Sequence, residues 1–213
     1  MVSAPQLICV TGPDGSGKTT QIARIAEALA KRGKKKIVPM TIWDMLLDPT
    51  TRGRVAFKSP GELDAFLEVL SPMARMLFLA HCLYAALDLA VARKPDLVLV
   101  NGYWYKYWAT EVAHGGDPEA MLGLMKIFPE PALTFCLDIS TEEAFRRKTK
   151  PSGYETGFAA ERTLEAFSSF QARARPPLER LANEKQWVRL NGNESVHALS
   201  EAIVNRIDAR ERC

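Results

Sequence analysis

The stretch Gly12-Pro13-Asp14-Gly15-Ser16-Gly17-Lys18-Thr19 directly follows the apolar run Leu7-Ile8-Cys9-Val10. It matches the pattern G-x-x-x-x-G-K-[ST] at every fixed position, in the strand–loop–helix context that this pattern requires. The glycines allow successive N–H groups to curl around a phosphate at the positive end of the next helix. The sequence therefore predicts a loop that binds ATP or GTP. The residues expected at the nucleotide are Gly12, Asp14, Gly15, Ser16, Gly17, Lys18, Thr19 and Thr20.

Two side chains of this loop have defined chemistry. Lys18 is expected to reach the β- and γ-phosphates, and the hydroxyl of Thr19 is expected to hold Mg²⁺. Helical spacing of apolar residues continues from Lys18 to Arg32, and Gly33 is a typical stop signal. The loop thus opens the first helix of the chain.

Short apolar runs alternate with helical patterns along the rest of the sequence. Solid apolar strands of this kind are typical of a parallel sheet that is covered by helices on both faces. We therefore predict one α/β domain over residues 1–213, with a P-loop NTPase fold and about five parallel strands. The runs that follow Leu7–Val10 are 37–40, 97–100, 133–137 and 187–190.

Capping residues predict where the other helices begin. Ser59-Pro60 and Ser71-Pro72 each resemble a helix start, and the second helix should run to about Arg93. Further helices are expected after Ser140, from about Phe158 to Asn183, and from Ser195 onward. Pro176-Pro177 should kink or interrupt the helix that contains them, because neither residue can donate a backbone hydrogen bond.

The composition is that of a soluble globular protein, with 47% hydrophobic and 25% charged residues. A net charge of +3 is too small to indicate a nucleic-acid or membrane partner. We find no apolar stretch of about 20 residues and no signal-peptide pattern, and so expect a cytoplasmic protein. The cysteines lack metal or disulfide spacing and are interpreted as core thiols. They are Cys9, Cys82, Cys136 and Cys213.

Ligand sites of parallel sheets lie at the carboxyl ends of the strands. In this chain that edge should hold the phosphate loop, Thr41–Asp44, Asn101–Tyr105 and Asp138–Ser140. Six aromatic residues fall near it: Trp43, Tyr103, Trp104, Tyr105, Tyr107 and Trp108. They predict a pocket for a base or nucleoside, although aromatic residues in a row are also typical of a core.

The wording from Thr11 to Gln21 is more specific than the general loop, and it resembles thymidylate kinases. These are P-loop enzymes that phosphorylate deoxythymidine monophosphate with ATP and Mg²⁺. The resemblance continues in Leu77-Phe78, in Leu137-Asp138 with Glu143–Arg147, and in Arg173-x-Arg175. It therefore covers most of the chain.

The resemblance implies roles for individual residues. Asp14 would face the sugar hydroxyl of the acceptor, and Phe78 would stack on the acceptor base. Because Gly15 is small, the transition-state cations should come from a lid at about 146–162. The residues implied in catalysis are Lys18, Asp14, Arg146, Arg147 and Lys150. A homodimer through apolar helices such as Ser71–Arg93 is also implied.

The acceptor side departs from the family. Where the family carries an Asp-Arg pair, this chain has Asn101-Gly102, and Cys82 stands in place of a further arginine. Asn101 keeps an oxygen that can touch a metal-bound water but loses the charge, which should weaken metal binding. The residues expected at the metal are Thr19 and Asn101. The expected substrate-binding residues are Asp14, Trp43, Phe78, Asn101, Tyr103 and Tyr105. Replacement cations could come from Arg52, Arg54, Arg75 or Lys106.

Taken together, these residues indicate a cofactor pair of ATP and Mg²⁺ and a small-molecule nucleotide acceptor. The predicted activity is transfer of the ATP γ-phosphoryl group to a nucleoside monophosphate, with deoxythymidylate as the first choice. One alternative is a kinase of the same fold whose acceptor is a modified pyrimidine nucleotide, a nucleoside or a base in DNA. Another is a nucleotide-binding protein with little transfer activity.

Overall fold

A computed structural model describes residues 5–33, 36–44, 57, 60–148 and 150–212. Five parallel strands form one sheet in the order β2-β3-β1-β4-β5. They are β1 Gln6–Thr11, β2 Ile37–Met40, β3 Leu97–Asn101, β4 Leu133–Asp138 and β5 Val188–Asn191. The central strand β1 pairs Ile8 with Leu99 on one side and with Leu133 on the other. The predicted parallel sheet of five strands is confirmed.

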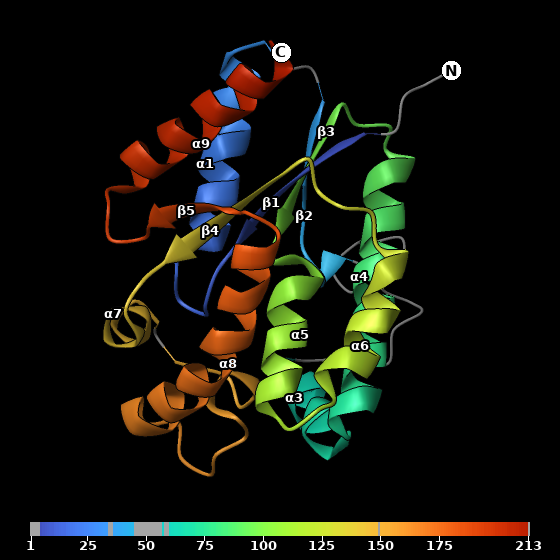
Figure 1. Cartoon of the computed structure of the whole chain (residues 1–213), viewed down its shortest axis with the longest axis vertical. Helices are drawn as coiled ribbons and strands as arrows, with labels where there is room; N and C mark the ends of the chain where they lie inside the picture. The colour runs from blue at the N-terminus through green and yellow to red at the C-terminus, as the bar shows by residue number, and fades with distance from the viewer. Residues whose placement is uncertain (1–4, 34–35, 45–56, 58–59, 149, 213) are drawn as a thin grey trace.

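Helices α1 (Lys18–Lys31) and α9 (Val196–Glu211) lie side by side over one face of the sheet (Figure 1). Apolar side chains of both helices pack on β1 and its neighbours, and they include Ile25, Leu29 and Ile203, all fully buried. Helical spacing puts these residues on one stripe, and burial of that stripe stabilises the layer.

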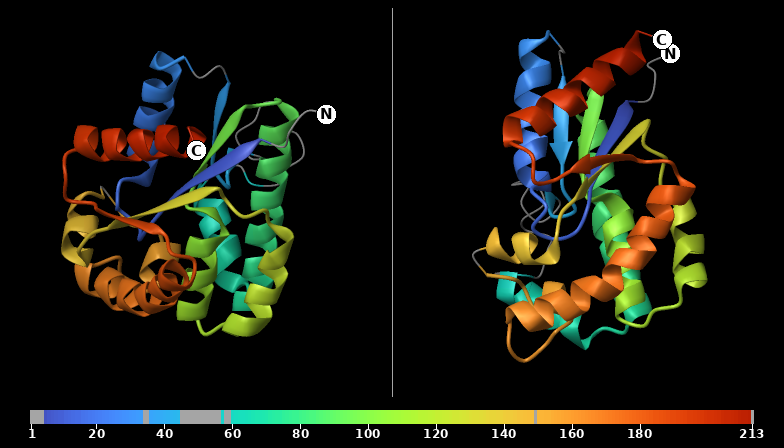
Figure 2. Two further views of the ribbon diagram at one scale, coloured as in Figure 1. Left: turned by 45° about the horizontal axis from the view of Figure 1, so that its top comes forward. Right: turned by 60° about the vertical axis from the view of Figure 1, so that its left-hand side comes forward.

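The opposite face is covered by α4 (Pro72–Ala92), α5 (Tyr103–Ala113) and α8 (Leu164–Glu184), as Figure 2 shows from two further sides. Four shorter segments complete this side of the molecule. They are α3 Pro60–Val69, α6 Pro118–Leu124, and the 3₁₀ turns η2 Met125–Ile127 and η3 Tyr154–Thr156. Helix α7 (Thr141–Arg146) follows β4 at the sheet edge that carries the phosphate loop.

Helix α8 differs from the sequence prediction at its start and at its prolines. It begins at Leu164, not near Phe158, because Gly157 and Phe158 have positive φ angles and Thr163 accepts a capping hydrogen bond from Ala166 N. The two prolines lie inside a helix that continues past them. Buried Leu178, Leu181 and Ala182 follow directly. Their burial offsets the lost backbone hydrogen bonds.

Helix α4 revises the expectation that no apolar stretch is long enough to cross a membrane. Among the described residues, this one helix passes by length and composition, with 21 residues and a hydropathy of 1.5. Half of its apolar window is buried inside the fold. It packs against β2 and α5, as the core helix of an α/β protein does.

The cysteines within the described residues are free. Cys9, Cys82 and Cys136 are all buried, and burial raises the pKa of Cys82 and of Cys136 to about 11 each. The prediction of core thiols is confirmed for these three, because a buried thiol of high pKa is unreactive. Cys213, Arg52, Arg54 and the start at Ser59 lie outside the described residues.

Candidate active site

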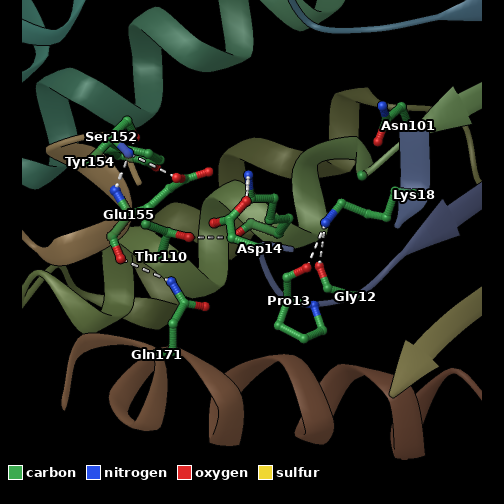
Figure 3. A network of polar contacts seen from close by, with 12 residues as sticks. Gly12, Pro13, Asp14, Lys18, Asn101, Thr110, Ser152, Tyr154, Glu155 and Gln171 are labelled. Atoms are coloured by element: carbon green, nitrogen blue, oxygen red, sulfur yellow. Dashed lines mark hydrogen bonds and ion pairs between the residues drawn. The ribbon is translucent and has the colours of Figure 1, made fainter. Parts of the chain in front are cut away.

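The phosphate loop connects the end of β1 to the start of α1. Lys18, the first residue of α1, turns back so that its Nζ donates to the carbonyls of Gly12 at 3.0 Å and Pro13 at 2.7 Å (Figure 3). Gly15 has a φ of +83°, and a Cβ added there would collide with the carbonyl oxygen of Ala144 in α7. The loop therefore needs glycine at this position both for its backbone conformation and for its close approach to α7.

Polar side chains in and beside the loop are placed to bind a ligand. The hydroxyl of Ser16 is buried and has no hydrogen-bond partner among the described residues, so it is free to bind a ligand atom in the cavity. Asn101 Nδ2 donates to Thr19 Oγ1 over 3.0 Å. The two predicted metal ligands, from β3 and α1, are thus brought together by the fold.

A cavity of about 810 Å³ opens in front of the loop. One wall is the loop itself, and Trp43, Asn101 and the lid segment contribute the other walls. This volume falls in the range of pockets that take a nucleotide-sized ligand. A separate cavity of about 40 Å³ lies behind the loop, against Phe167 and Leu178 of α8. It has room for water-sized molecules and not for a nucleotide.

The lid is tied to two helices beneath it. Lys148 Nζ contacts Glu155 Oε1 at 2.8 Å, and Glu155 Oε2 accepts from the backbone N–H of Ser152 at 2.9 Å. Gln171 of α8 donates to the Glu155 carbonyl (Figure 3), and the Tyr154 hydroxyl donates to Glu111 of α5. These contacts hold the described part of the predicted lid against the cavity.

The lid cations divide into two groups. Arg147, Lys148 and Lys150 line the cavity. Arg146 does not: its side chain is 75% exposed, and its guanidinium is bound by Glu143 on the same helix. Arg147 is also paired with Glu143, at 2.7 Å, but its side chain is 32% exposed and reaches the cavity. The structure therefore gives no support to a catalytic role for Arg146, because its side chain is directed to solvent.

Asp14 forms an ion pair that the sequence did not predict. Its Oδ1 lies 2.6 Å from Lys106 Nζ of α5, and both side chains are largely buried. Burial would raise the pKa of Asp14, but the ammonium groups of Lys106 and Lys18 outweigh it and hold that pKa well below its usual range. Burial lowers the pKa of Lys18 to about 8, although Asp14 opposes this effect. Asp14 is therefore ionised and faces two cations at the cavity wall.

The prediction that Tyr103 and Tyr105 bind substrate is wrong for this structure. Both side chains are fully buried, and their hydroxyls donate to the Pro129 carbonyl and to Glu130 Oε2. The reason is that this stretch is the start of α5 and not an irregular strand end, so helical geometry turns these rings into the core together with Trp104 and Trp108. Of the six aromatic residues, Trp43 and Tyr107 line the cavity.

Phe78 lies in an aromatic cluster away from the loop. Its ring centroid is 5.1 Å from that of Phe66 and 6.0 Å from that of Phe57. The side chain is partly buried and is not among the residues that line the cavity. Its role as a base platform stays a prediction.

Sequence reasoning also missed a buried charge cluster beneath the lid. Arg75 Nε donates to both carboxylate oxygens of Glu111 at 2.8 and 2.9 Å, and Tyr154 donates to the same carboxylate. Arg75 Nη1 also donates to the carbonyls of Leu67 and Leu70 at the end of α3. No local pattern signals these pairs, because their members come from different elements.

Among known proteins, no family model matches the chain. The chain is 27% identical over 210 residues to a probable thymidylate kinase of Sulfurisphaera tokodaii, and the matched region covers 98% of this chain and 99% of that protein. It is 34% identical over 146 residues to a probable thymidylate kinase of Archaeoglobus fulgidus, covering 68% of this chain and 69% of the relative. The fold resembles that of the Candida albicans thymidylate kinase with a TM-score of 0.66, 16% identity, and coverage of 98% and 93% of the two chains.

Proposed function

The chain belongs to the thymidylate kinase family, and we propose that it transfers the γ-phosphoryl group of ATP to deoxythymidylate. The observation that carries this proposal is the 810 Å³ cavity, which has the phosphate loop on one wall and three lid cations on another. Phosphoryl transfer needs positioning and positive charge more than it needs an acid or a base. A cavity of this kind supplies both.

The ATP side has the groups that a triphosphate requires. The Ser16 hydroxyl, which has no partner in the described part of the chain, can donate to a phosphate oxygen. Lys18 can exchange its two loop carbonyls for the β- and γ-phosphates. Thr19 and Asn101 would hold Mg²⁺, which when bound supplies positive charge beside the β- and γ-phosphates. Within the described residues no cluster of three or more His, Cys, Asp or Glu side chains is available.

The proposed transfer step is the in-line displacement that phosphoryl transfer uses. A 5′-phosphate oxygen of the acceptor attacks the γ-phosphorus in line, while the bond from that phosphorus to the β–γ bridging oxygen breaks and ADP leaves. Lys18 stays with the moving phosphoryl group and neutralises its charge. Arg147, Lys148 and Lys150 stand on the lid side of the same space. Contacts of the lid with α5 and α8 support exclusion of water from the reaction.

Asp14 is the proposed contact of the acceptor sugar. Its carboxylate lines the cavity beside the loop and is held ionised by neighbouring ammonium groups. An ionised carboxylate can accept a hydrogen bond from a sugar hydroxyl, and a charge-assisted bond of this kind is stronger than a neutral one. Trp43 lines the same cavity and could pack against the acceptor.

The first experiment measures ADP release with Mg-ATP over a panel of acceptors that includes deoxythymidylate, deoxyuridylate, deoxycytidylate, thymidine and single-stranded DNA. We expect deoxythymidylate to be turned over fastest. Turnover confined to thymidine or DNA would replace this function by a kinase with a different acceptor. If the protein binds ATP but releases no ADP in response to any acceptor, it is a nucleotide-binding protein with little transfer activity.

Substitution of Lys18 tests whether the loop does the chemistry. Lys18→Met should lower kcat by about 100- to 1,000-fold, because one cation at the transferring group is lost. Its circular dichroism should be unchanged. Lys31→Met is the matched control, since Lys31 lies on the same helix with its side chain 73% exposed. Full activity of Lys18→Met would contradict the assignment.

A homodimer is proposed through the outer face of α4. Leu77, Tyr84 and Val91 are spaced seven residues apart on this helix and are 51%, 40% and 39% exposed. Exposed apolar side chains in one row are typical of a helix that packs against a partner. Light scattering should give twice the monomer mass, and Tyr84→Glu should give the monomer mass. A monomeric wild-type protein would rule this out.

A further inference from the structure

The missing arginine at position 102 raises the question of which cation meets the acceptor phosphate. Four basic residues of the sequence could replace it: Arg52, Arg54, Arg75 and Lys106. Arg75 is 3% exposed and is bound by Glu111 and two carbonyls beneath the lid. Arg52 and Arg54 lie outside the described residues. Among the four, and within the described part of the chain, Lys106 is the one that lines the cavity.

The stem of Lys106 lies beside Gly102. A Cβ placed on Gly102 would be 3.7 Å from Lys106 Cδ and 4.0 Å from Lys18 Cε. The stem of Lys106 therefore lies in van der Waals contact with the place where a side chain at 102 would begin, next to the lysine of the phosphate loop. Lys106 lies one helical turn after Gly102 at the start of α5, so the two residues share one face of the helix.

The charged end of Lys106 is held at the cavity wall. Its Nζ lies 2.6 Å from Asp14 Oδ1 and 5.3 Å from the ring centroid of Tyr107. The side chain is 15% exposed, so the ammonium is mostly withdrawn from water and still borders the cavity. A cation in this setting binds an anion more strongly than a cation on the surface does.

From these contacts we infer that Lys106 binds the 5′-phosphate of the nucleoside monophosphate acceptor, in place of the arginine that the family carries at the position of Gly102. The inference rests on the proposed function, because it requires an acceptor that brings a phosphate into the cavity. An ammonium has three donors. Lys106 can therefore keep its bond to Asp14 while it donates to a phosphate oxygen, so that Asp14 and Lys106 would orient the sugar and the phosphate of one acceptor together.

The test compares Lys106→Met, Lys106→Arg and the exposed control Lys126→Met. Loss of one charge-assisted contact should raise the KM for deoxythymidylate by about 10- to 100-fold in Lys106→Met. The KM for ATP should change less than about twofold. Lys106→Arg keeps the charge and should recover most of the loss, and Lys126→Met should match the wild type. An unchanged deoxythymidylate KM in Lys106→Met would overturn the inference.

A second measurement separates a phosphate contact from an indirect effect through Asp14. Calorimetric binding of deoxythymidylate should weaken in Lys106→Met, whereas binding of thymidine, which has no phosphate, should not. Equal weakening of both ligands would overturn the inference. If Lys106→Met does not fold, Lys106→Gln takes its place in both measurements with the same expected results.

The proposed function fails in a different way from this inference. Wild-type protein that turns over no nucleoside monophosphate would overturn the function, and the role of Lys106 with it. Wild-type protein that phosphorylates deoxythymidylate, together with a fully active Lys106→Met, would overturn the role of Lys106 and leave the function standing.

Discussion

Gly15 illustrates how a single residue sets the phosphate loop. A side chain at this position is unfavourable for two reasons: the backbone has a positive φ, and a Cβ would collide with the Ala144 carbonyl. Gly33 after α1 also has a positive φ, of +86°, but a Cβ on it would meet nothing within 4 Å. A side chain at Gly33 would therefore meet only backbone strain, whereas a side chain at Gly15 would meet both backbone strain and a steric collision.

The prediction at this scale is that Gly15→Ala and Gly33→Ala differ in kind. Gly33→Ala should lower the free energy of unfolding by about 1 kcal/mol, since a left-handed conformation is unfavourable for alanine. It should leave ATP affinity unchanged. Gly15→Ala should abolish ATP binding, because the backbone of α7 or of the loop must move. Urea unfolding and calorimetry measure the two effects. Normal ATP binding by Gly15→Ala would refute the steric argument.

At the scale of elements, the Arg75–Glu111–Tyr154 cluster joins α3, α4, α5 and the lid. Glu111 is fully buried and takes hydrogen bonds from both other members. A buried ion pair adds little net stability compared with apolar packing, yet removal of one partner leaves a buried charge without compensation. A single substitution in the cluster should therefore lower the free energy of unfolding strongly, and a double substitution that removes both charges should lower it less.

We predict that Arg75→Met lowers the free energy of unfolding by about 3 to 5 kcal/mol. The double variant Arg75→Met/Glu111→Gln should recover part of the loss, because glutamine removes the charge and keeps an acceptor for the Tyr154 hydroxyl. Urea unfolding of the two variants and the wild type measures this. A single variant within about 1 kcal/mol of the wild type, or a double variant less stable than the single one, would show that the cluster does not act as an ion pair.

At the scale of the whole molecule, His114 couples stability to pH. Its ring packs against Tyr154, Phe158 and Phe170, where α5, the lid and α8 meet. Burial, together with the positive charges of Arg75 and Arg173, lowers the pKa of His114 to about 4. Between about pH 6.5 and pH 4, His114 is therefore protonated in the unfolded chain and neutral in the folded protein.

The free energy of unfolding should consequently fall as pH drops from about 6.5 towards 4. His114→Phe should show a shallower fall, because phenylalanine fits the aromatic surroundings and does not titrate. Urea unfolding at pH 7.5 and 4.5 measures the difference. His197→Gln, at a histidine whose side chain is 82% exposed, should follow the wild type. Parallel curves for wild type and His114→Phe would contradict the expected linkage.

Local signals were sufficient for most elements of the fold. The run Leu7–Val10 with the loop after it, the stop at Gly33 and the caps at Ser71, Ser140 and Ser195 are properties of neighbouring residues, and each marks an observed boundary. Helix α5 was missed because its first residues are aromatic and its start at Gly102 lacks a side-chain cap. Aromatic residues are weak helix formers, so the packing of this helix against α4 and α8 decides its conformation.

The phosphate loop, the parallel sheet and the family resemblance could be predicted from the chain alone, because they depend on short motifs and on local periodicity. The packing of distant segments was needed to show which aromatic rings enter the core, that Arg146 faces solvent, and that Asp14 meets Lys106. The physical reason is that an ion pair between a loop and a distant helix has no local signature. It forms where the phosphate loop at the end of β1 and the packing of α5 bring opposite charges together in a place that water reaches poorly.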